Sequence, residues 1–222
     1  MYMKKLTSQV VCTYNDPVAD TKYGRLRGLK IDSTYIFRGI KYADARRFHD
    51  PVEPESWEGI REAYQFGHVC CELNTPVPHD QFNVPHFFYP QNANCQYLNV
   101  WTQHLDKEAK RPVMVWIHGG GWFSGSSVEL HSYDGENLSA HDDVVVVSMN
   151  HRLNVLGYLD LSPFGEEYKN SANVGLADLV MALKWVHENI ENFGGDPGNV
   201  TIFGQSGGGG KVVALTQTTA AD

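Results

Sequence analysis

Long apolar runs are missing from this 222-residue chain. No stretch of 18 apolar residues occurs, so no membrane span is predicted and we expect no membrane partner. Lys4 and Lys5 lie near the N-terminus, but polar residues interrupt the stretch after them, which argues against a secretory signal. Internal repeats, low-complexity tracts and charged linkers are also missing. We therefore expect a cytoplasmic protein whose residues 1–222 form a single domain.

Positive charge and cysteine are both scarce. The 18 Lys and Arg residues against 26 Asp and Glu give a net charge of −8, which argues against nucleic-acid binding. His187 and Glu188 are followed by Glu191 where a zinc-protease helix would need histidine. The spacing of the cysteines contains no paired CxxC units, so we expect no metal and no cofactor. The four cysteines, expected as free thiols in a cytoplasmic protein, are Cys12, Cys70, Cys71 and Cys95.

Apolar periodicity indicates an α/β protein. Val113–Ile117 and Val144–Met149 are continuous apolar runs, typical of strands that are buried on both faces of a parallel sheet. Helical spacing over Leu176–Asn192 is followed by a third such run, Val200–Phe203. A strand, helix and strand in this order predict a right-handed crossover and a parallel pair. Shorter segments expected as N-terminal strands are Val10–Thr13, Arg25–Leu29 and Thr34–Phe37, and a short helix is expected near Gly135–Ala140.

A serine stands between small residues directly after the third apolar run, in Gly204-Gln205-Ser206-Gly207-Gly208. A nucleophile on a sharp strand-to-helix turn needs such neighbours, since bulky side chains there would clash. The amide of Gly207 would then face a developing oxyanion. A phosphate-binding Walker loop is the rival interpretation, and Gln205 and Val212 do not fit its pattern.

A second glycine-rich segment, His118-Gly119-Gly120-Gly121-Trp122, also follows a predicted strand directly. Ester hydrolysis passes through a tetrahedral intermediate with a negative oxygen, which backbone N–H groups stabilise. Glycines let a loop present those groups without intervening side chains. Two strand-end motifs in this order favour acyl-transfer chemistry over two unrelated turns.

These motifs resemble the type-B carboxylesterase family, which includes bacterial esterases and cholinesterases. The resemblance extends over roughly residues 20–222, and further segments that carry it are Phe37–Ala43, Asn94–Trp101, Asn150–Leu153, Gly175–Asp178 and Asn189–Pro197. It implies an α/β-hydrolase fold, with a mostly parallel sheet covered by helices and preceded by a small N-terminal antiparallel β element. It also implies a small-molecule ester substrate.

The same resemblance implies roles for individual residues. Ser206 would be the nucleophile, and the amides of Gly120, Gly121 and Gly207 would form the oxyanion hole. The family often carries a disulfide, which here would pair Cys70 with Cys95, with Cys71 as an adjacent competitor. Three residues depart from the family pattern. Gln205 replaces a usual acid, Gly207 a usual alanine and Asn154 a common glycine.

The residues after Ser206 include no histidine and a single acid, Asp222. A serine needs a base, and the base needs an orienting carboxylate, so the acid and histidine of the triad are expected to be missing from this chain. A surrogate base, His118 or His151, is the less favoured hypothesis. The alternative function is an inactive fragment or a non-enzymatic binding relative.

The sheet is also expected to lack the fold's C-terminal strands, which would leave the strand ending at Phe203 as an exposed edge. We therefore expect a complementary C-terminal chain or self-association through that edge. The aromatic stretch Phe82–Tyr89 indicates an apolar wall, which many esters would fit.

Overall fold

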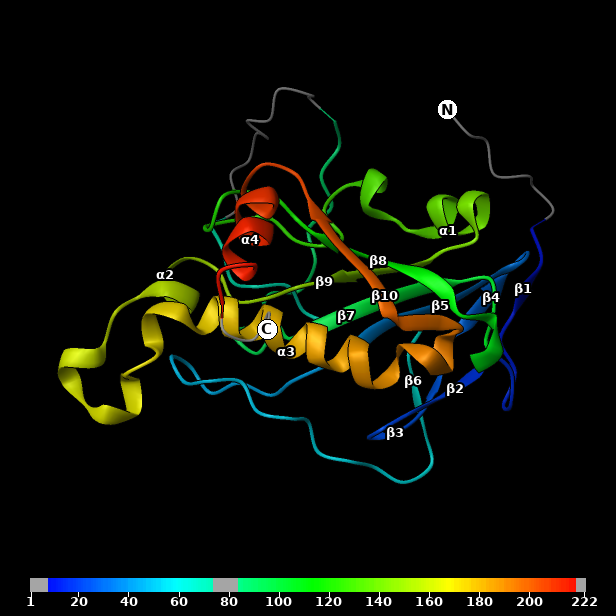
Figure 1. Cartoon of the computed structure of the whole chain (residues 1–222), viewed down its shortest axis with the longest axis horizontal. Helices are drawn as coiled ribbons and strands as arrows, with labels where there is room; N and C mark the ends of the chain where they lie inside the picture. Colours follow the sequence, from blue (N-terminus) through cyan, green and yellow to red (C-terminus); the bar gives the residue numbers. More distant parts are fainter. Residues whose placement is uncertain (1–7, 74–83, 219–222) are drawn as a thin grey trace.

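A seven-stranded sheet forms the centre of the computed structural model, which describes residues 8–73 and 84–218 (Figure 1). The strand order is β1-β4-β5-β7-β9-β8-β10. In that order the strands are Val10–Val11, Leu29–Ile31, Thr34–Lys41, Tyr97–Thr102, Val145–Met149, Arg111–Ile117 and Gly195–Gly204. A smaller sheet contains β2 (Val18–Thr21), β3 (Gly24–Arg27) and β6 (Ile60–Glu62) in that order.

The large sheet is mixed rather than mostly parallel, which corrects the expectation from the sequence. Among the described residues, β8 pairs in parallel with β9 and β10, and the other four pairings are antiparallel. The parallel strands are the three that contain the continuous apolar runs, as predicted. The small sheet is also mixed, because β2 and β3 are antiparallel whereas β3 and β6 are parallel.

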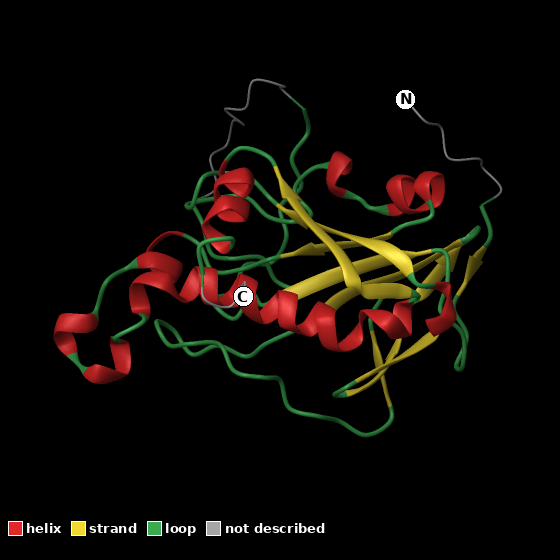
Figure 2. Ribbon diagram, in the orientation of Figure 1, coloured by secondary structure: helices red, strands yellow, loops and turns green. Residues whose placement is uncertain are grey.

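Helices cover both faces of the large sheet (Figures 1 and 2). On one face, α3 (Val174–Asn189) buries Leu179, Ala182 and Trp185 in the same core cluster as Val113, Val115 and Ile117 of β8. On the other face, Leu138 of α1 (Glu136–Asp142) packs in a second cluster with Met114 and Trp101. Alternate residues of β8 therefore enter the two cores, which explains its continuous apolar sequence.

Shorter helices connect these elements. Two are α-helical, α2 (Asn154–Tyr158) and α4 (Gly207–Leu215). The 3-10 helices are η1 (Lys107–Ala109), η2 (His131–Tyr133), η3 (Ser162–Phe164), η4 (Glu166–Tyr168), η5 (Ser171–Asn173) and η6 (Ile190–Phe193). Over the described ranges, no helix has the length and apolarity needed to cross a membrane.

The predicted helix between the second and third apolar runs is confirmed as α3, although its two strands are not neighbours. The chain leaves β9, forms α3 and returns as β10, with β8 lying between them. As expected, β10 is the last strand in the order formed by the described residues. Its apolar residues Val200, Ile202 and Phe203 are therefore half-buried, unlike the buried residues of β9.

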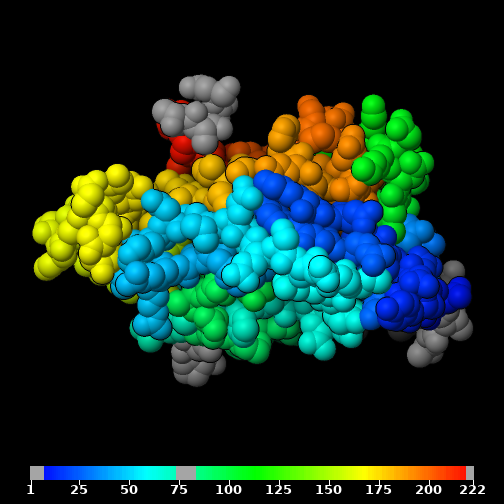
Figure 3. Space-filling view, turned by 90° about the horizontal axis from the view of Figure 1, so that it is seen from below, coloured from blue at the N-terminus to red at the C-terminus, as the bar shows by residue number. Residues whose placement is uncertain are grey.

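The stretch from Pro51 to Pro90, expected as a long surface excursion, contains the short strand β6, and its other described residues are loop or isolated bridges (Figure 2). In the view from below, blue and cyan N-terminal segments spread across the molecule, and the yellow segment that contains η3 and η4 protrudes at one end (Figure 3).

Candidate active site

Ser206 lies on a sharp turn between β10 and α4. Its backbone angles are φ 55° and ψ −124°, a region that residues with side chains rarely adopt. The turn is closed by the Gly208 amide, which donates to the Gln205 carbonyl at 2.9 Å. A Cβ on Gly204 would lie 2.6 Å from the carbonyl carbon of Gly208. Glycine is therefore required there, and the exposed serine is held in a strained conformation.

The glycine loop after β8 packs directly against this turn. Gly120 and Gly121 have φ values of 83° and 63°, which favour glycine. A Cβ on Gly207 would lie 2.3 Å from the carbonyl oxygen of Gly121, so the loop approaches α4 more closely than alanine allows. A Cβ on Gly119 would lie 3.4 Å from Cβ of Ser206. The parallel pairing of β8 and β10 thus brings two motifs together that are far apart in sequence.

Three backbone amides in this region have no acceptor. Among residues 8–73 and 84–218, the N–H groups of Gly120, Gly121 and Gly207 donate no hydrogen bond, and the Ser206 hydroxyl has no partner. The amide of Gly207 is also the first of α4, where the helix dipole adds positive potential. These donors are suited to an anionic oxygen bound beside Ser206.

Hydrogen bonds from distant segments hold the glycine loop in place. The Gly125 amide donates to the Glu72 carboxylate at 2.6 Å, and burial raises the pKa of that carboxyl group. Asn154, at φ 49°, donates its side-chain amide to the carbonyls of Cys71 and Phe123. Such a positive φ favours glycine, and asparagine tolerates it while adding two bonds to the loop.

The two histidines considered as surrogate bases form a buried pair. The rings of His118 and His151 stack with centroids 4.8 Å apart, and both residues are buried. Loss of solvation lowers the pKa of His118 to about 3 and places that of His151 well below its usual range. Neither ring hydrogen-bonds to Ser206 in the described part of the chain. Imidazoles with such low pKa values are weak bases near neutral pH, which argues against this hypothesis.

The sequence interpretation missed the most unusual side chain of this region, Lys211 of α4. It is fully buried, and its Nζ donates to the His118 carbonyl oxygen at 3.3 Å. Burial lowers the pKa of Lys211 to about 8. One signal was available, since Lys211 falls three residues after Gly208 and four before Leu215, and both of these face the core.

A second missed feature is the buried ion pair between Arg152 and Asp178. Nη2 and Nε of Arg152 donate to the two carboxylate oxygens at 2.6 and 2.8 Å, and the Arg152 amide donates as well. Nη1 of Arg152 donates to the carbonyls of Arg46 and His49. This pair joins α3 to the segment after β9, just before Asn154. The sequence shows both residues but not their contact.

The cysteines are free thiols, so the Cys70–Cys95 disulfide is not formed in the structure. Both residues are buried in one cluster, and a hydrogen bond from the Cys95 thiol lowers the pKa of Cys70. The Leu153 amide also donates to Sγ of Cys70 at 3.2 Å. The structure therefore brings together Cys70 and Cys95, the pair that the resemblance implied, as unbonded thiols.

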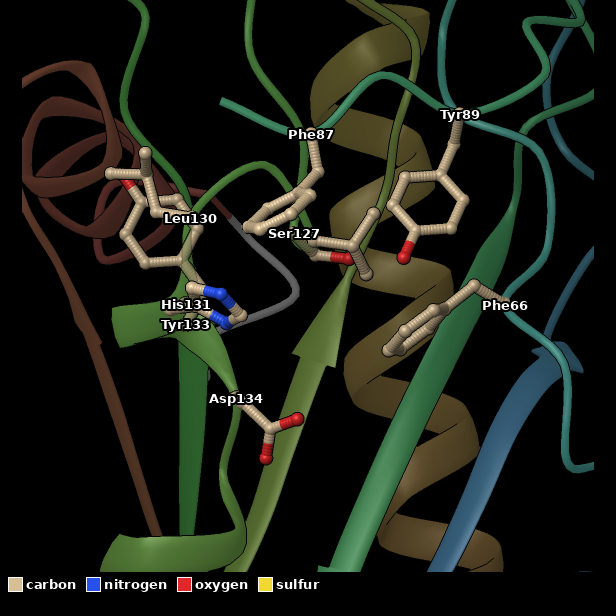
Figure 4. Close-up of a pocket in the computed structure, with 9 residues that line it drawn as sticks. Phe66, Phe87, Tyr89, Ser127, Leu130, His131, Tyr133 and Asp134 are labelled. Carbon is tan, nitrogen blue, oxygen red and sulfur yellow. The ribbon is translucent and has the colours of Figure 1, made fainter. Parts of the chain in front are cut away.

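An aromatic cavity of about 150 Å³ lies beside the chain that continues from the glycine loop (Figure 4). Phe66, Phe87 and Tyr89 line one side, while His131 and Tyr133 line the other, with Asp134 at the base of the view. Part of the predicted apolar wall is thus present. Phe82 at its start lies outside the described residues, as does Asp222.

Comparisons with known proteins agree with this geometry. A model of the carboxylesterase family matches residues 15–222. Over 210 residues the chain is 42% identical to para-nitrobenzyl esterase of Bacillus subtilis, covering 92% of this chain and 41% of that protein. It is 39% identical to acetylcholinesterase of Danio rerio, covering 89% of this chain and 32% of that protein.

Solved structures give the same result. An esterase of the anaerobe Clostridium hathewayi that hydrolyses aliphatic aromatic polyesters superposes with a TM-score of 0.93 at 58% identity, covering 97% of this chain and 43% of that one. A Geobacillus stearothermophilus carboxylesterase superposes with a TM-score of 0.82 at 41% identity, covering 92% of this chain and 41% of that one. The α/β-hydrolase fold is confirmed, and the chain spans about two fifths of the length of these relatives.

Proposed function

Because this chain belongs to the carboxylesterase family, whose members hydrolyse carboxylic esters, we propose that it carries the nucleophile and oxyanion hole of such an enzyme. Ser206 attacks the carbonyl carbon of a small-molecule ester, and the alcohol leaves as the acyl-enzyme forms. The observation that carries this proposal is the presence of three unpartnered amides around a strained, exposed serine.

The proposed oxyanion hole consists of the amides of Gly120, Gly121 and Gly207. As the carbonyl oxygen becomes negative, these groups donate to it without reorganising, because the loop and turn are already fixed. Removing one such donor typically lowers kcat by about 10²–10³-fold. The close contact of Gly207 with Gly121 holds the donors from two separate segments in one place.

The proton of Ser206 must pass to a base during attack. The buried rings of His118 and His151 are poorly suited, as shown above. We therefore propose that the triad histidine and its carboxylate come from outside this chain. In support, the chain spans between about a third and about two fifths of the length of the relatives compared above.

Hydrolysis of p-nitrophenyl acetate by this chain and by its Ser206→Ala variant tests the proposal. We expect a Ser206-dependent rate, low in the chain alone because the base is missing. Ser162→Ala is the matched control, since Ser162 is an exposed serine on η3 and should leave the rate unchanged. Labelling by a fluorophosphonate, with the modified residue mapped by mass spectrometry, identifies the nucleophile directly.

A binding role without hydrolysis is the second candidate. It is favoured by one observation: no histidine in the described part of the chain hydrogen-bonds to Ser206. Equal hydrolysis rates in the parent and Ser206→Ala, together with no labelling at Ser206, would exclude the enzymatic role of the chain and leave an inactive fragment or a non-enzymatic binding relative.

We also propose that the free edge of β10 binds either a complementary chain or a second copy of this one. The edge strand is partly exposed, and among the described residues its backbone groups on one side have no neighbouring strand in the sheet order. Sedimentation of the purified chain tests this, and we expect association that increases with concentration. A monomer with a cooperative thermal transition would contradict it.

A further inference from the structure

A lysine without a counter-ion is buried behind the glycine loop. Lys211 is fully buried, and in the described part of the chain no carboxylate pairs with it. Its Nζ reaches one hydrogen-bond acceptor, the His118 carbonyl oxygen. Burying a lone ammonium group costs several kcal/mol on general grounds, so its retention calls for an explanation.

Lys211 contacts both ends of the three-glycine segment. Its Nζ bonds to His118, which precedes Gly119, and lies 5.8 Å from the ring centroid of Trp122, which follows Gly121. Gly208, on the same face of α4, also packs against the His118 carbonyl. The helix that presents Ser206 at its start therefore holds the loop through a residue one turn further along.

The surroundings of Lys211 leave its positive charge uncompensated. The titratable side chains whose pKa values it affects are His118 at the end of β8 and His151 after β9, and Lys211 lowers both. Both imidazoles are therefore neutral near pH 7. Nε2 of His118 and both ring nitrogens of His151 have no hydrogen-bond partner. The carboxylates of Glu72 and Glu129 lie near Gly125 on the other side of His118, and in the described part of the chain neither pairs with Lys211.

We propose that Lys211 is a positioning residue for ester hydrolysis. It anchors the glycine loop through His118, and its charge favours the anionic intermediate over the neutral ester. This inference rests on the proposed function of Ser206. The lysine acts through the loop and touches neither the substrate nor Ser206. Because its charge has no partner in the resting protein, the interaction strengthens only when the oxyanion forms, as catalysis requires.

The binding of phenylboronic acid tests this proposal without needing turnover. Oγ of Ser206 forms a bond to boron, the serine proton is released to solvent, and the boron becomes a tetrahedral anion that resembles the intermediate. We expect Lys211→Met to bind the boronic acid about tenfold more weakly than the parent, since a nearby charge contributes less than a direct donor. Lys211→Arg, which keeps the charge, should remain within about threefold of the parent. Lys169→Met, at an exposed lysine, is the matched control.

A second measurement separates the charge from the packing. The titration of the Lys211 side chain, followed by NMR and assigned by the loss of its signal in Lys211→Arg, should shift to higher pH when the boronate adduct forms. If the charged lysine strengthens boronate binding, then the bound boronate must favour the charged lysine by the same factor. A merely structural lysine would show the same titration with and without the adduct. This readout uses the parent protein, so it holds even if Lys211→Met fails to fold.

The outcomes distinguish the two proposals. Adduct formation at Ser206 with equal affinity in parent and folded Lys211→Met, or an unchanged Lys211 titration, would overturn the role of Lys211 alone. No difference between the parent and Ser206→Ala in boronic acid binding would overturn the proposed nucleophile, and the role of Lys211 with it.

Discussion

Two buried polar clusters differ in how completely their groups are paired. In the first, each nitrogen of the Arg152 guanidinium and both oxygens of Asp178 have hydrogen-bond partners. In the second, Lys211 has one weak hydrogen bond, and three ring nitrogens of His118 and His151 have none. Satisfied buried charges maintain a structure, whereas unsatisfied ones store unfavourable free energy. The second cluster lies behind the glycine loop. There, under the role proposed for Lys211, its unpaired charge can stabilise the anionic intermediate of ester hydrolysis.

Breaking the paired cluster should have the largest effect on stability. Asp178→Asn leaves the Arg152 guanidinium buried without its counter-charge, so we expect the free energy of unfolding to fall by about 3–5 kcal/mol. Urea unfolding followed by circular dichroism measures this loss. Glu166→Gln, at an exposed ion pair with Lys169, should change stability by less than about 0.5 kcal/mol. If Asp178→Asn and Glu166→Gln lowered the free energy of unfolding by similar amounts, the buried ion pair would be no more important for stability than the exposed one.

Lowering the pH should have the next largest effect on stability, through the unpaired cluster of His118 and His151. The pKa of His118 is about 3 in the fold, that of His151 is also lowered, and both return to about 6.5 on unfolding. Below pH 6.5 the unfolded chain therefore binds protons that the folded chain does not. Each histidine should lower the free energy of unfolding by about 1.4 kcal/mol per pH unit as pH falls, down to about 3 for His118. Urea unfolding at a series of pH values, repeated with His151→Phe, should show the slope reduced by one histidine.

Removing the charge of Lys211 should stabilise the protein, opposite in sign to the change at Asp178. We expect Lys211→Met to raise the free energy of unfolding by about 2 kcal/mol at pH 7, because an uncompensated buried charge is replaced by an apolar chain. The pKa of Lys211 is about 8 in the fold and about 10.4 when unfolded, so parent stability should rise between these pH values. This rise should be absent in Lys211→Met. A destabilised variant would show that the lysine is well accommodated.

The smallest expected effect concerns the contact between α4 and the loop. Gly207→Ala places a Cβ about where the Gly121 carbonyl lies, so the loop must move away from Ser206. We expect a loss of about tenfold in the Ser206-dependent esterase rate, equal to about 1.4 kcal/mol, with little change in melting temperature. Gly210→Ala, whose Cβ would meet open space, is the control. An unchanged rate in Gly207→Ala would show that the loop position is not critical.

The sequence predicted the elements whose signals are local. The three apolar runs, the helix between Leu176 and Asn192 and the glycine turn after Phe203 are all present, with shifted boundaries. Strand neighbours could not be predicted in this way, because the pairing of β7 with both β5 and β9 depends on residues far apart in the chain. The burial of Lys211 and its contact with His118 were hidden for the same reason. A lysine in a helix is usually exposed, and only the packed fold shows otherwise.

The strand order also determines how the chain folds during synthesis. β8 and β9 are synthesised before α3 and β10, so the edge of β8 that pairs with β10 has no partner strand until β10 has been made. Pairings of this kind between distant segments form slowly and expose apolar edges in the meantime. The strand that closes β8 is also the one that ends at Ser206. The nascent protein therefore acquires its nucleophile in the same step that covers the second edge of its central parallel strand.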